Sequence, residues 1–368
     1  MTLWILLRLL AGVVALVVGA EFLVRGAASI ATRFGISPVA VGLTVVSFGT
    51  SAPELAVSVG AAVTGEADVA LGNVIGSNIV NILFILGVSA VFGGLTIASR
   101  LVRLDLPLLL GATLVVLLMS LDGSVGRLDG AVLVAGIIVY TVWLLRQSRR
   151  ESAAMAAEAE EAVAGIEGAS ADDPLPGLLA YVVGGLVLLV VGAQVFVGAA
   201  TEFAVNAGVS KTVVGLTIVA VGTSLPELAT SVIAAWRGER DIAVGNVLGS
   251  NMFNLLCVLG ASGLFAARGV AVDDAVLRLD YPVMIAATVV LLPIFWNGFA
   301  IKRWEGVLLA MFYVVYVLFL VLDATDHSAT GWVGPLALVA APLVLLAFTA
   351  TGVQGWRRHR RAQTSPST

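Results

Sequence analysis

The stretch GLTVVSFGTSAPELAVSVGAAVTGEADVALGNVIGSNIVNILFILG, from Gly42 to Gly87, returns as GLTIVAVGTSLPELATSVIAAWRGERDIAVGNVLGSNMFNLLCVLG, from Gly215 to Gly260. The two stretches align without a gap. The likeness continues beyond them, since RLDLP at residues 103–107 matches RLDYP at residues 278–282. Self-similarity on this scale indicates a chain built by duplication of one unit.

The composition around these repeats is that of a membrane protein. Of 368 residues, 59% are hydrophobic and 12% are charged, which is too few charges for the surface of a soluble domain. Apolar runs of about 20 residues, the length that crosses a bilayer core, recur along the chain. We interpret the first run as a span and not a signal peptide, because it lacks a basic start and a cleavage site. The single cysteine, Cys257, lies in an apolar run, excludes a disulfide within the chain and is interpreted as a packing residue.

The pattern predicts an all-α integral membrane protein of ten plus one spans. The spans are expected near 3–31, 38–63, 68–93, 104–121, 127–145, 177–205, 211–236, 241–266, 279–298, 303–322 and 332–353. Residues 1–145 form a first five-helix repeat, 146–176 a charged linker, 177–322 a second repeat, and 323–368 an appended eleventh span with a basic tail. Because five is odd, the second repeat must insert upside down, an architecture typical of secondary transporters.

Basic residues predict the orientation, because cytoplasmic loops are enriched in Lys and Arg. With the N-terminus outside, the inside segments hold Arg33, Arg100, Arg103, Arg146, Arg149, Arg150, Arg237, Arg240, Lys302, Arg303, Arg357, Arg358, Arg360 and Arg361. The outside segments hold only Arg127, Lys211, Arg268 and Arg278. We therefore expect a multi-pass protein of the cell membrane with an outside N-terminus, and with the linker 146–176 and the C-terminus in the cytoplasm.

Both repeats carry Gly-Thr-Ser-x-Pro-Glu inside a span, at 49–54 and 222–227. Pro53 and Pro226 each lack an N–H and clash with the carbonyl four residues earlier, so spans 2 and 7 should break there and release carbonyl oxygens. Such carbonyls are tolerated at membrane depth only where they line a cavity or are buried in protein. Glu54 and Glu227 follow one turn later. An acid inside a membrane marks a functional site by default, although a protonated core residue beside an ordinary kink is the alternative.

The partner motif is Gly-Asn-x-x-Gly-Ser-Asn-x-x-Asn, at 72–81 and 245–254. Its residues four apart share one helix face, which carries Asn73, Ser77 and Asn81, and in the second repeat Asn246, Ser250 and Asn254. Ser77, Asn81, Ser250 and Asn254 are expected to be ion ligands. For Asn73, Asn78, Asn246 and Asn251, binding an ion and joining helices by hydrogen bonds are both open.

Together these motifs offer two carboxylates with hydroxyl, amide and carbonyl oxygens, whereas His327 and His359 lie in a loop and in the tail. All-oxygen sets suit hard cations such as Ca²⁺, Mg²⁺ or Na⁺. Two carboxylates balance one divalent ion. Once it leaves, Na⁺ or H⁺ must replace its charge, because the empty, doubly charged site is too costly to reorient.

Other polar residues carry less information. Asp105 and Asp280 precede prolines and are expected to cap helices. Glu21, which aligns with Gln194, could line a cavity. Trp332 and Trp356 flank the last span and are interpreted as interfacial anchors.

With these two duplicated motifs, the chain resembles the Ca²⁺/cation antiporter superfamily, and within it the prokaryotic sodium/calcium exchangers. The resemblance covers residues 1 to about 322. It implies that Glu54 and Glu227 bind Ca²⁺ with the carbonyls of Thr50 and Thr223. It also implies Na⁺ sites that use Ser47, Ser51, Ser77, Ala220, Ser224, Ser250, Asn81 and Asn254. Some members carry an aspartate where this chain has Asn254, and the family plan usually stops at ten spans.

The sequence therefore predicts an antiporter that exchanges Ca²⁺ for Na⁺ by alternating access. H⁺- or K⁺-dependent Ca²⁺ exchange is the alternative, and a cation channel is a further one that two inverted copies disfavour. An enzyme is not expected, because no metalloprotease His pair occurs. The expected partners are Ca²⁺, Na⁺ and the lipid bilayer, with no nucleic acid and no cofactor beyond the transported ions.

Overall fold

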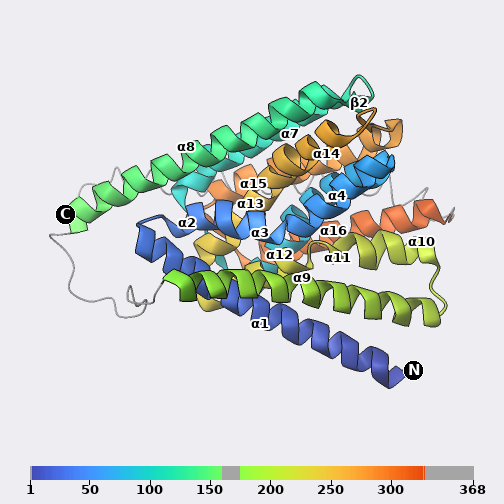
Figure 1. Cartoon of the computed structure of the whole chain (residues 1–368), viewed down its shortest axis with the longest axis horizontal. Coiled ribbons are helices and arrows are strands. Elements are labelled where there is room, and N and C mark those ends of the chain that lie inside the picture. Colours follow the sequence, from blue (N-terminus) through green and yellow to red (C-terminus); the bar gives the residue numbers. More distant parts are fainter. Residues whose placement is uncertain (1, 160–174, 326, 328–368) are drawn as a thin grey trace.

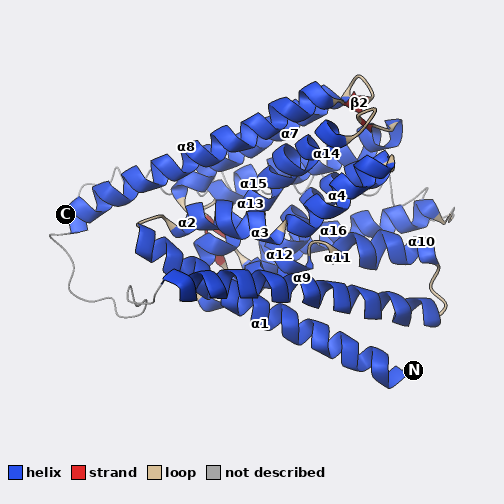
Figure 2. Ribbon diagram, in the orientation of Figure 1, coloured by secondary structure: helices blue, strands red, loops and turns tan. Residues whose placement is uncertain are grey.

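The computed structural model describes residues 2–159, 175–325 and 327. Within these ranges nearly every residue is helical, and the strands are two residues long (Figure 2). Several spans contain a short π-helical segment, labelled η, in which the helix is wider by one residue per turn.

The first half runs from residue 2 to residue 159. Its elements are α1 (Thr2–Phe34), α2 (Pro38–Val41), η1 (Gly42–Val46), α3 (Ser47–Thr50), α4 (Ala52–Thr64), α5 (Ala67–Ile79), η2 (Val80–Ile85), α6 (Leu86–Gly93), β1 (Leu95–Thr96), η3 (Leu101–Asp105), α7 (Leu106–Ser120), β2 (Ser124–Val125) and α8 (Arg127–Ala159). Helix α8 continues past residue 145, into the charged segment that follows the fifth span.

The second half repeats this order. Its elements are α9 (Leu175–Asn206), α10 (Lys211–Val214), η4 (Gly215–Val219), α11 (Ala220–Gly222), α12 (Leu225–Arg237), α13 (Arg240–Phe253), η5 (Asn254–Val258), α14 (Leu259–Phe265), β3 (Val270–Ala271), η6 (Val276–Asp280), α15 (Tyr281–Trp296), β4 (Ala300–Ile301) and α16 (Arg303–Ala324).

Ten spans fit these helices. Among the described residues, eight helices are long and apolar enough to cross a membrane, and two bent pairs bring the number to ten. The bent pairs are Pro38–Thr50 with Ala52–Thr64, at 48°, and Gly215–Gly222 with Leu225–Arg237, at 60°. The breaks predicted in spans 2 and 7 are therefore confirmed. The predicted eleventh span, 332–353, and its flanking tryptophans lie outside the described residues.

The short strands demonstrate the inversion of the repeats. Strand β1, after the third span, pairs with β4, after the ninth, and β2, after the fourth span, pairs with β3, after the eighth. If the two halves were inserted the same way, the loop holding β1 would share a face with the loop holding β3. The observed pairing places these equivalent loops on opposite faces, as an odd-numbered unit requires.

Two spans form the centre of the bundle. Within their most apolar windows, 78% of Ala67–Gly93 and 89% of Arg240–Phe265 is buried, against 39% or less in the other continuous spans. These central spans carry the asparagine motifs. The outer helices expose large apolar side chains such as Leu3, Leu10 and Leu118, as a surface that faces lipid tails should.

Helices α1 and α9 lie side by side and antiparallel along one edge of the molecule (Figure 1). Glycines allow this approach. A Cβ atom at Gly19 would lie 2.8 Å from the Gly185 carbonyl oxygen, and one at Gly185 would lie 2.7 Å from the Gly19 carbonyl oxygen. Close backbone contact through small residues is a common way to pack helices in lipid.

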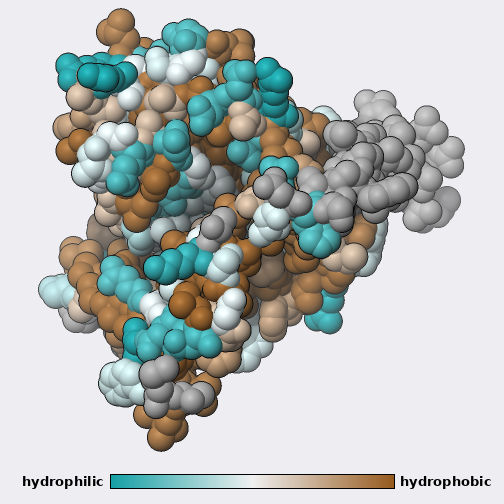
Figure 3. All heavy atoms as spheres, turned by 90° about the vertical axis from the view of Figure 1, so that its right-hand side faces the viewer, coloured by the Kyte–Doolittle hydropathy of each residue, from teal (hydrophilic) through white to brown (hydrophobic). Residues whose placement is uncertain are grey.

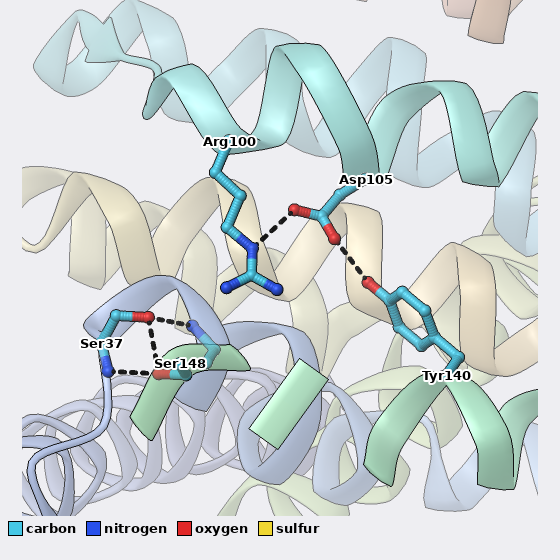
Figure 4. Close-up of polar contacts among 6 residues, drawn as sticks. Ser37, Arg100, Asp105, Tyr140 and Ser148 are labelled. Carbon is cyan, nitrogen blue, oxygen red and sulfur yellow. Dashed lines mark hydrogen bonds and ion pairs between the residues drawn. The ribbon is translucent and has the colours of Figure 1, made fainter. Parts of the chain in front are cut away.

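The expected caps at Asp105 and Asp280 are wrong. Both residues have helical backbone angles inside a continuous span, and neither side chain caps a helix. Asp105 accepts a hydrogen bond from the Tyr140 hydroxyl at 3.0 Å and pairs with Arg100 at 3.4 Å (Figure 4). Asp280 accepts one from the Tyr316 hydroxyl at 2.7 Å. The π-helical turns η3 and η6 carry each helix through the aspartate, so the side chain joins neighbouring spans.

The base of the first broken span is also tied to α8. The Ser37 backbone N–H donates to the Ser148 hydroxyl at 2.8 Å, and the two hydroxyls lie 3.1 Å apart (Figure 4). The Ser37 hydroxyl also accepts from the Ala40 N–H and caps α2. This contact fixes the start of the broken span against a continuous one.

Candidate ion-binding site

Each broken span bends at the same serine of the repeated motif. Ser51 and Ser224 leave the helical conformation with nearly equal backbone angles, φ −85° and ψ 9° against φ −90° and ψ 9°. Pro53 and Pro226 then lie in the first turn of the new helices α4 and α12, where the missing N–H has no partner to lose. The repeated sequence therefore produces the same break twice.

The carbonyls that the sequence predicted to be free lie next to the bends. Among the described backbone hydrogen bonds outside regular helices, none ends on the carbonyl oxygen of Thr50 or Thr223. Both residues lie one position before the bend. Carbonyl oxygens without a backbone donor inside a membrane bundle need a cation, water or a side chain.

The two glutamates stand at the N-termini of the new helices and are fully buried. The positive end of the helix dipole favours a negative side chain in the first turn. Each carboxylate accepts a hydrogen bond from the opposite repeat: Ser51 donates to Glu227 Oε1 at 2.8 Å, and Ser224 donates to Glu54 Oε1 at 3.0 Å. These crossed bonds place the two breaks face to face.

Several buried polar atoms of the two repeated motifs have no hydrogen-bond partner among the described residues. They are Oε2 of Glu54, Oε2 of Glu227, Oδ1 of Asn81, and both amide atoms of Asn254. Buried polar groups are normally paired, and a set of unpaired ones requires an explanation. Four of these five atoms are oxygens, which makes the cluster suitable for a hard cation.

The asparagines of this cluster lie on π-helical turns. Asn81 is in η2, and Asn254 begins η5. Such turns are frequent at functional sites. Asn81 donates to Asn251 Oδ1 at 2.9 Å, and Asn251 donates to the Asn78 carbonyl at 3.3 Å. The Asn251 side chain therefore joins two helices, whereas the Asn78 side chain donates to the Val74 carbonyl of its own helix at 2.7 Å.

The structure encloses ten of the twelve residues expected to bind ions: Ser47, Thr50, Ser51, Glu54, Ser77, Asn81, Ser224, Glu227, Ser250 and Asn254 are each at most 1% exposed. Ser77 lies 3.4 Å from Ser224, and Ser250 lies 3.4 Å from both Thr50 and Glu227, measured between side-chain oxygens. Thr223 is half-buried, and Ala220 is exposed at the start of α11. The two halves therefore enclose their equivalent residues unequally.

Four further residues that the sequence did not assign, or left open, make contacts beside the glutamates. Asn73 donates to Ser58, and Asn246 donates to Ser231, each at 2.9 Å. Ser58 and Ser231 are fully buried. The repeat could have pointed to Ser58 and Ser231, because they occupy equivalent positions in its two copies.

The two broken spans also differ in exposure after the bend. Along α4, Ala52, Ala56 and Val57 are exposed, whereas in α12 the equivalent Leu225, Ala229 and Thr230 are half-buried or buried. Figure 3 views the end of the molecule that carries α10 and β2, and its surface is hollowed between the mass that contains α1 and α9 and the mass above it. Helix α4 runs from the site toward this end, so the helix after the first bend is more exposed than its equivalent α12, while the two glutamates themselves are buried.

Glu21 lies in ion pairs and not alone in a cavity. Its carboxylate pairs with Arg25 at 3.1 Å and with Arg237 of α12. The aligned position in the second half is Gln194, which cannot form such pairs. Glu21 therefore joins α1 to α12.

Comparison with known proteins places this geometry in a family. A family model described as sodium/calcium exchanger protein matches residues 4–146 and 177–322. The sodium/calcium exchanger MaX1 of Methanosarcina acetivorans is 35% identical over 343 residues, covering 85% of this chain and 97% of its own. The inner membrane protein YrbG of Escherichia coli is 34% identical over 311 residues, covering 84% and 94%.

A solved structure has the same fold. The sodium-calcium exchanger NCX_Mj, soaked with zero Na⁺ and Ca²⁺, superposes with a TM-score of 0.73 at 28% sequence identity. The match covers 87% of this chain and 100% of that one. The family model and this structure thus cover both inverted repeats.

Proposed function

This chain belongs to the sodium/calcium exchanger family, and we propose that Glu54 and Glu227 carry Ca²⁺ in its exchange for Na⁺. The protein is a multi-pass membrane antiporter of Na⁺ and Ca²⁺. The observation that carries it is the pair of fully buried carboxylates, each with one oxygen held by the opposite repeat and one without a partner.

Ca²⁺ would lie between the two unpartnered carboxylate oxygens and the carbonyls of Thr50 and Thr223. Two negative charges and neutral oxygens form the donor set that a hard divalent cation prefers. Among the described residues, no group of three His, Cys, Asp or Glu side chains could hold a metal ion. Cation binding therefore depends on two acids, supplemented by neutral oxygens.

Na⁺ would use the oxygens that surround this position. Ser51, Ser77, Ser224 and Ser250 offer hydroxyls, Ser47 and Ala220 offer oxygens one turn before the bend, and Asn81 and Asn254 offer amide oxygens. Both Asn254 atoms are unpartnered and buried, so its amide is free to meet an ion or a water. The middle of the site has no third carboxylate, which lowers the charge available there.

Exchange follows from the cost of the empty site. Two carboxylates without a cation in a low-dielectric bundle repel each other and have lost their hydration. Reorientation of the empty protein is therefore slow, and either Ca²⁺ or replacing monovalent cations must be bound before the site faces the other side. The inverted repeats supply the two states of the transporter. When the two halves interchange their conformations, access to the site moves from one side of the membrane to the other.

The orientation proposed for this cycle places the N-terminus outside, and the linker 146–176 and the C-terminus in the cytoplasm. The end viewed in Figure 3, where the N-terminal end of α1 lies, is then the extracellular end.

The purified protein reconstituted into proteoliposomes tests the proposal. Uptake of radiolabelled Ca²⁺ would be measured with an outward gradient of Na⁺, K⁺ or H⁺, one at a time, with an uncoupling ionophore to remove secondary gradients. Uptake driven by Na⁺ alone is expected. Uptake that requires K⁺, or that follows H⁺ in the absence of Na⁺, would replace the proposed coupling with the alternative ion.

A further inference from the structure

The glutamate in each half is joined to the break in the other half through an asparagine. Asn246 Nδ2 donates to the Ser231 hydroxyl at 2.9 Å and to the Glu227 carbonyl oxygen at 3.4 Å. Its Oδ1 accepts a hydrogen bond from the Thr50 hydroxyl at 3.1 Å. One amide thus connects α13, the glutamate helix α12 and the bend of the first repeat.

The other half makes the same set of contacts. Asn73 Nδ2 donates to the Ser58 hydroxyl at 2.9 Å and to the Glu54 carbonyl oxygen at 3.3 Å. Its Oδ1 accepts from the Thr223 hydroxyl at 3.3 Å. The same three contacts therefore occur in both halves, which argues against a chance arrangement.

The orientation of each amide is dictated by its neighbours. A backbone carbonyl can only accept a hydrogen bond, so the amide nitrogen must face the glutamate carbonyl. The amide oxygen then faces the threonine hydroxyl, which has to donate. This distinguishes Asn73 and Asn246 from Asn254, whose amide atoms are both unpartnered.

We propose that Asn73 and Asn246 are positioning residues for cation binding, each with its serine, Ser58 or Ser231, as a support. This inference rests on the proposed site between Glu54 and Glu227. Each asparagine uses both ends of its amide to fix the threonine of the opposite break relative to its own glutamate. The carbonyl oxygen and the carboxylate that meet one ion come from different repeats, and the asparagine is the side chain that bonds to both segments.

A double-mutant cycle tests this arrangement. Ser231→Ala removes the acceptor that orients Asn246, and Thr50→Val removes the donated hydrogen bond while keeping the backbone carbonyl. Loss of one hydrogen bond, worth ~1 kcal/mol, should raise the KM for Ca²⁺ about fivefold in each single variant. For Ser231→Ala the maximal rate per folded molecule should stay near that of the wild type, because the charges are unchanged.

The double variant, Ser231→Ala with Thr50→Val, is the decisive one. Since both substitutions act through Asn246, the double variant should remain near fivefold, whereas independent effects would multiply to about 25-fold. Ser262→Ala is the matched control. Ser262 is fully buried but donates only to the Val258 carbonyl of its own helix, at 2.8 Å, so its KM should equal that of the wild type.

Multiplying effects, or an unchanged KM in Ser231→Ala, would overturn the positioning role. If Ser231→Ala does not fold, Ser58→Ala with Thr223→Val provides the same cycle in the other half. Glu227→Gln measured in parallel separates the two proposals. Wild-type Ca²⁺ transport by Glu227→Gln would refute the site itself. Loss of transport in Glu227→Gln together with an unchanged KM in Ser231→Ala would refute only the positioning role.

Discussion

Alanine at Gly185 should force α1 and α9 apart, while alanine one residue earlier, at Gly184, should not. A Cβ atom at Gly185 would lie 2.7 Å from the Gly19 carbonyl oxygen and 2.7 Å from the Leu23 nitrogen. Both are backbone atoms, which cannot rotate away as a side chain could. At Gly184 no atom outside its own helix and its chain neighbours lies within 4 Å of the added Cβ.

The pair of variants isolates the cost of packing. Both replace glycine by alanine within the same helix, so the gain in helix propensity, up to ~1 kcal/mol, is common to the two. The remaining difference is the cost of overpacking, about 1–3 kcal/mol. Gly185→Ala should therefore be less stable than Gly184→Ala by that amount.

Thermal unfolding of the two purified variants in the same detergent measures the difference. Gly185→Ala should melt below Gly184→Ala by about 2–4 °C for each kcal/mol, the scale known for domains of 150–250 residues. Equal melting temperatures would refute the close backbone contact between α1 and α9. A higher melting temperature for Gly185→Ala than for Gly184→Ala would refute this contact more strongly.

Three further predictions concern the orientation in the membrane, the charge at position 254 and the buried Asp105. A cysteine placed at Ser170 in a Cys257→Ala background should resist an impermeant thiol reagent added to intact cells and react after permeabilisation; labelling from outside would reverse the orientation. Asn254→Asp should shift the activity profile to higher pH, because a third carboxylate beside two others binds a proton more tightly by repulsion; an unchanged profile in an active variant would place Asn254 away from the acids. Tyr140→Phe removes a hydrogen bond to the buried Asp105 carboxylate, worth about 1.5–3 kcal/mol, so the melting temperature should fall while the KM for Ca²⁺ stays unchanged; a raised KM would connect this cluster to the site.

The repeat made most of the fold predictable from the sequence. A duplicated unit with five apolar runs, which matches without a gap over residues 42–87 and 215–260, left one arrangement of the halves, and the strand pairing confirmed it. The breaks at Ser51 and Ser224 were predictable because proline has a local effect on the backbone. Local chemistry could not predict that Asp105 and Asp280 lie within helices, since a π-helical turn before a proline looks in sequence like a cap.

The sequence predicts which residues the candidate site would use, but not how they are connected. Burial of Glu54 and Glu227 follows from their motif, whereas the crossed bonds from Ser51 and Ser224 depend on how the halves dock. The same limit applies to Asn73 and Asn246, whose bonds to the opposite threonines are long-range contacts. The greater enclosure of α12 than of α4 depends on the conformational state, which a symmetric pair of sequences does not contain.

Sodium-driven Ca²⁺ uptake by Glu54→Gln and Glu227→Gln in proteoliposomes tests the central claim most directly. Glutamine keeps the shape of the side chain and one carbonyl oxygen but removes the charge, which counts for far more in a low-dielectric site than in water. Both variants should remain folded and lose Ca²⁺ exchange to a similar degree, because the inverted halves contribute equivalent oxygens. Ca²⁺ flux near that of the wild type in either variant would contradict the assignment of the two glutamates as the Ca²⁺ ligands.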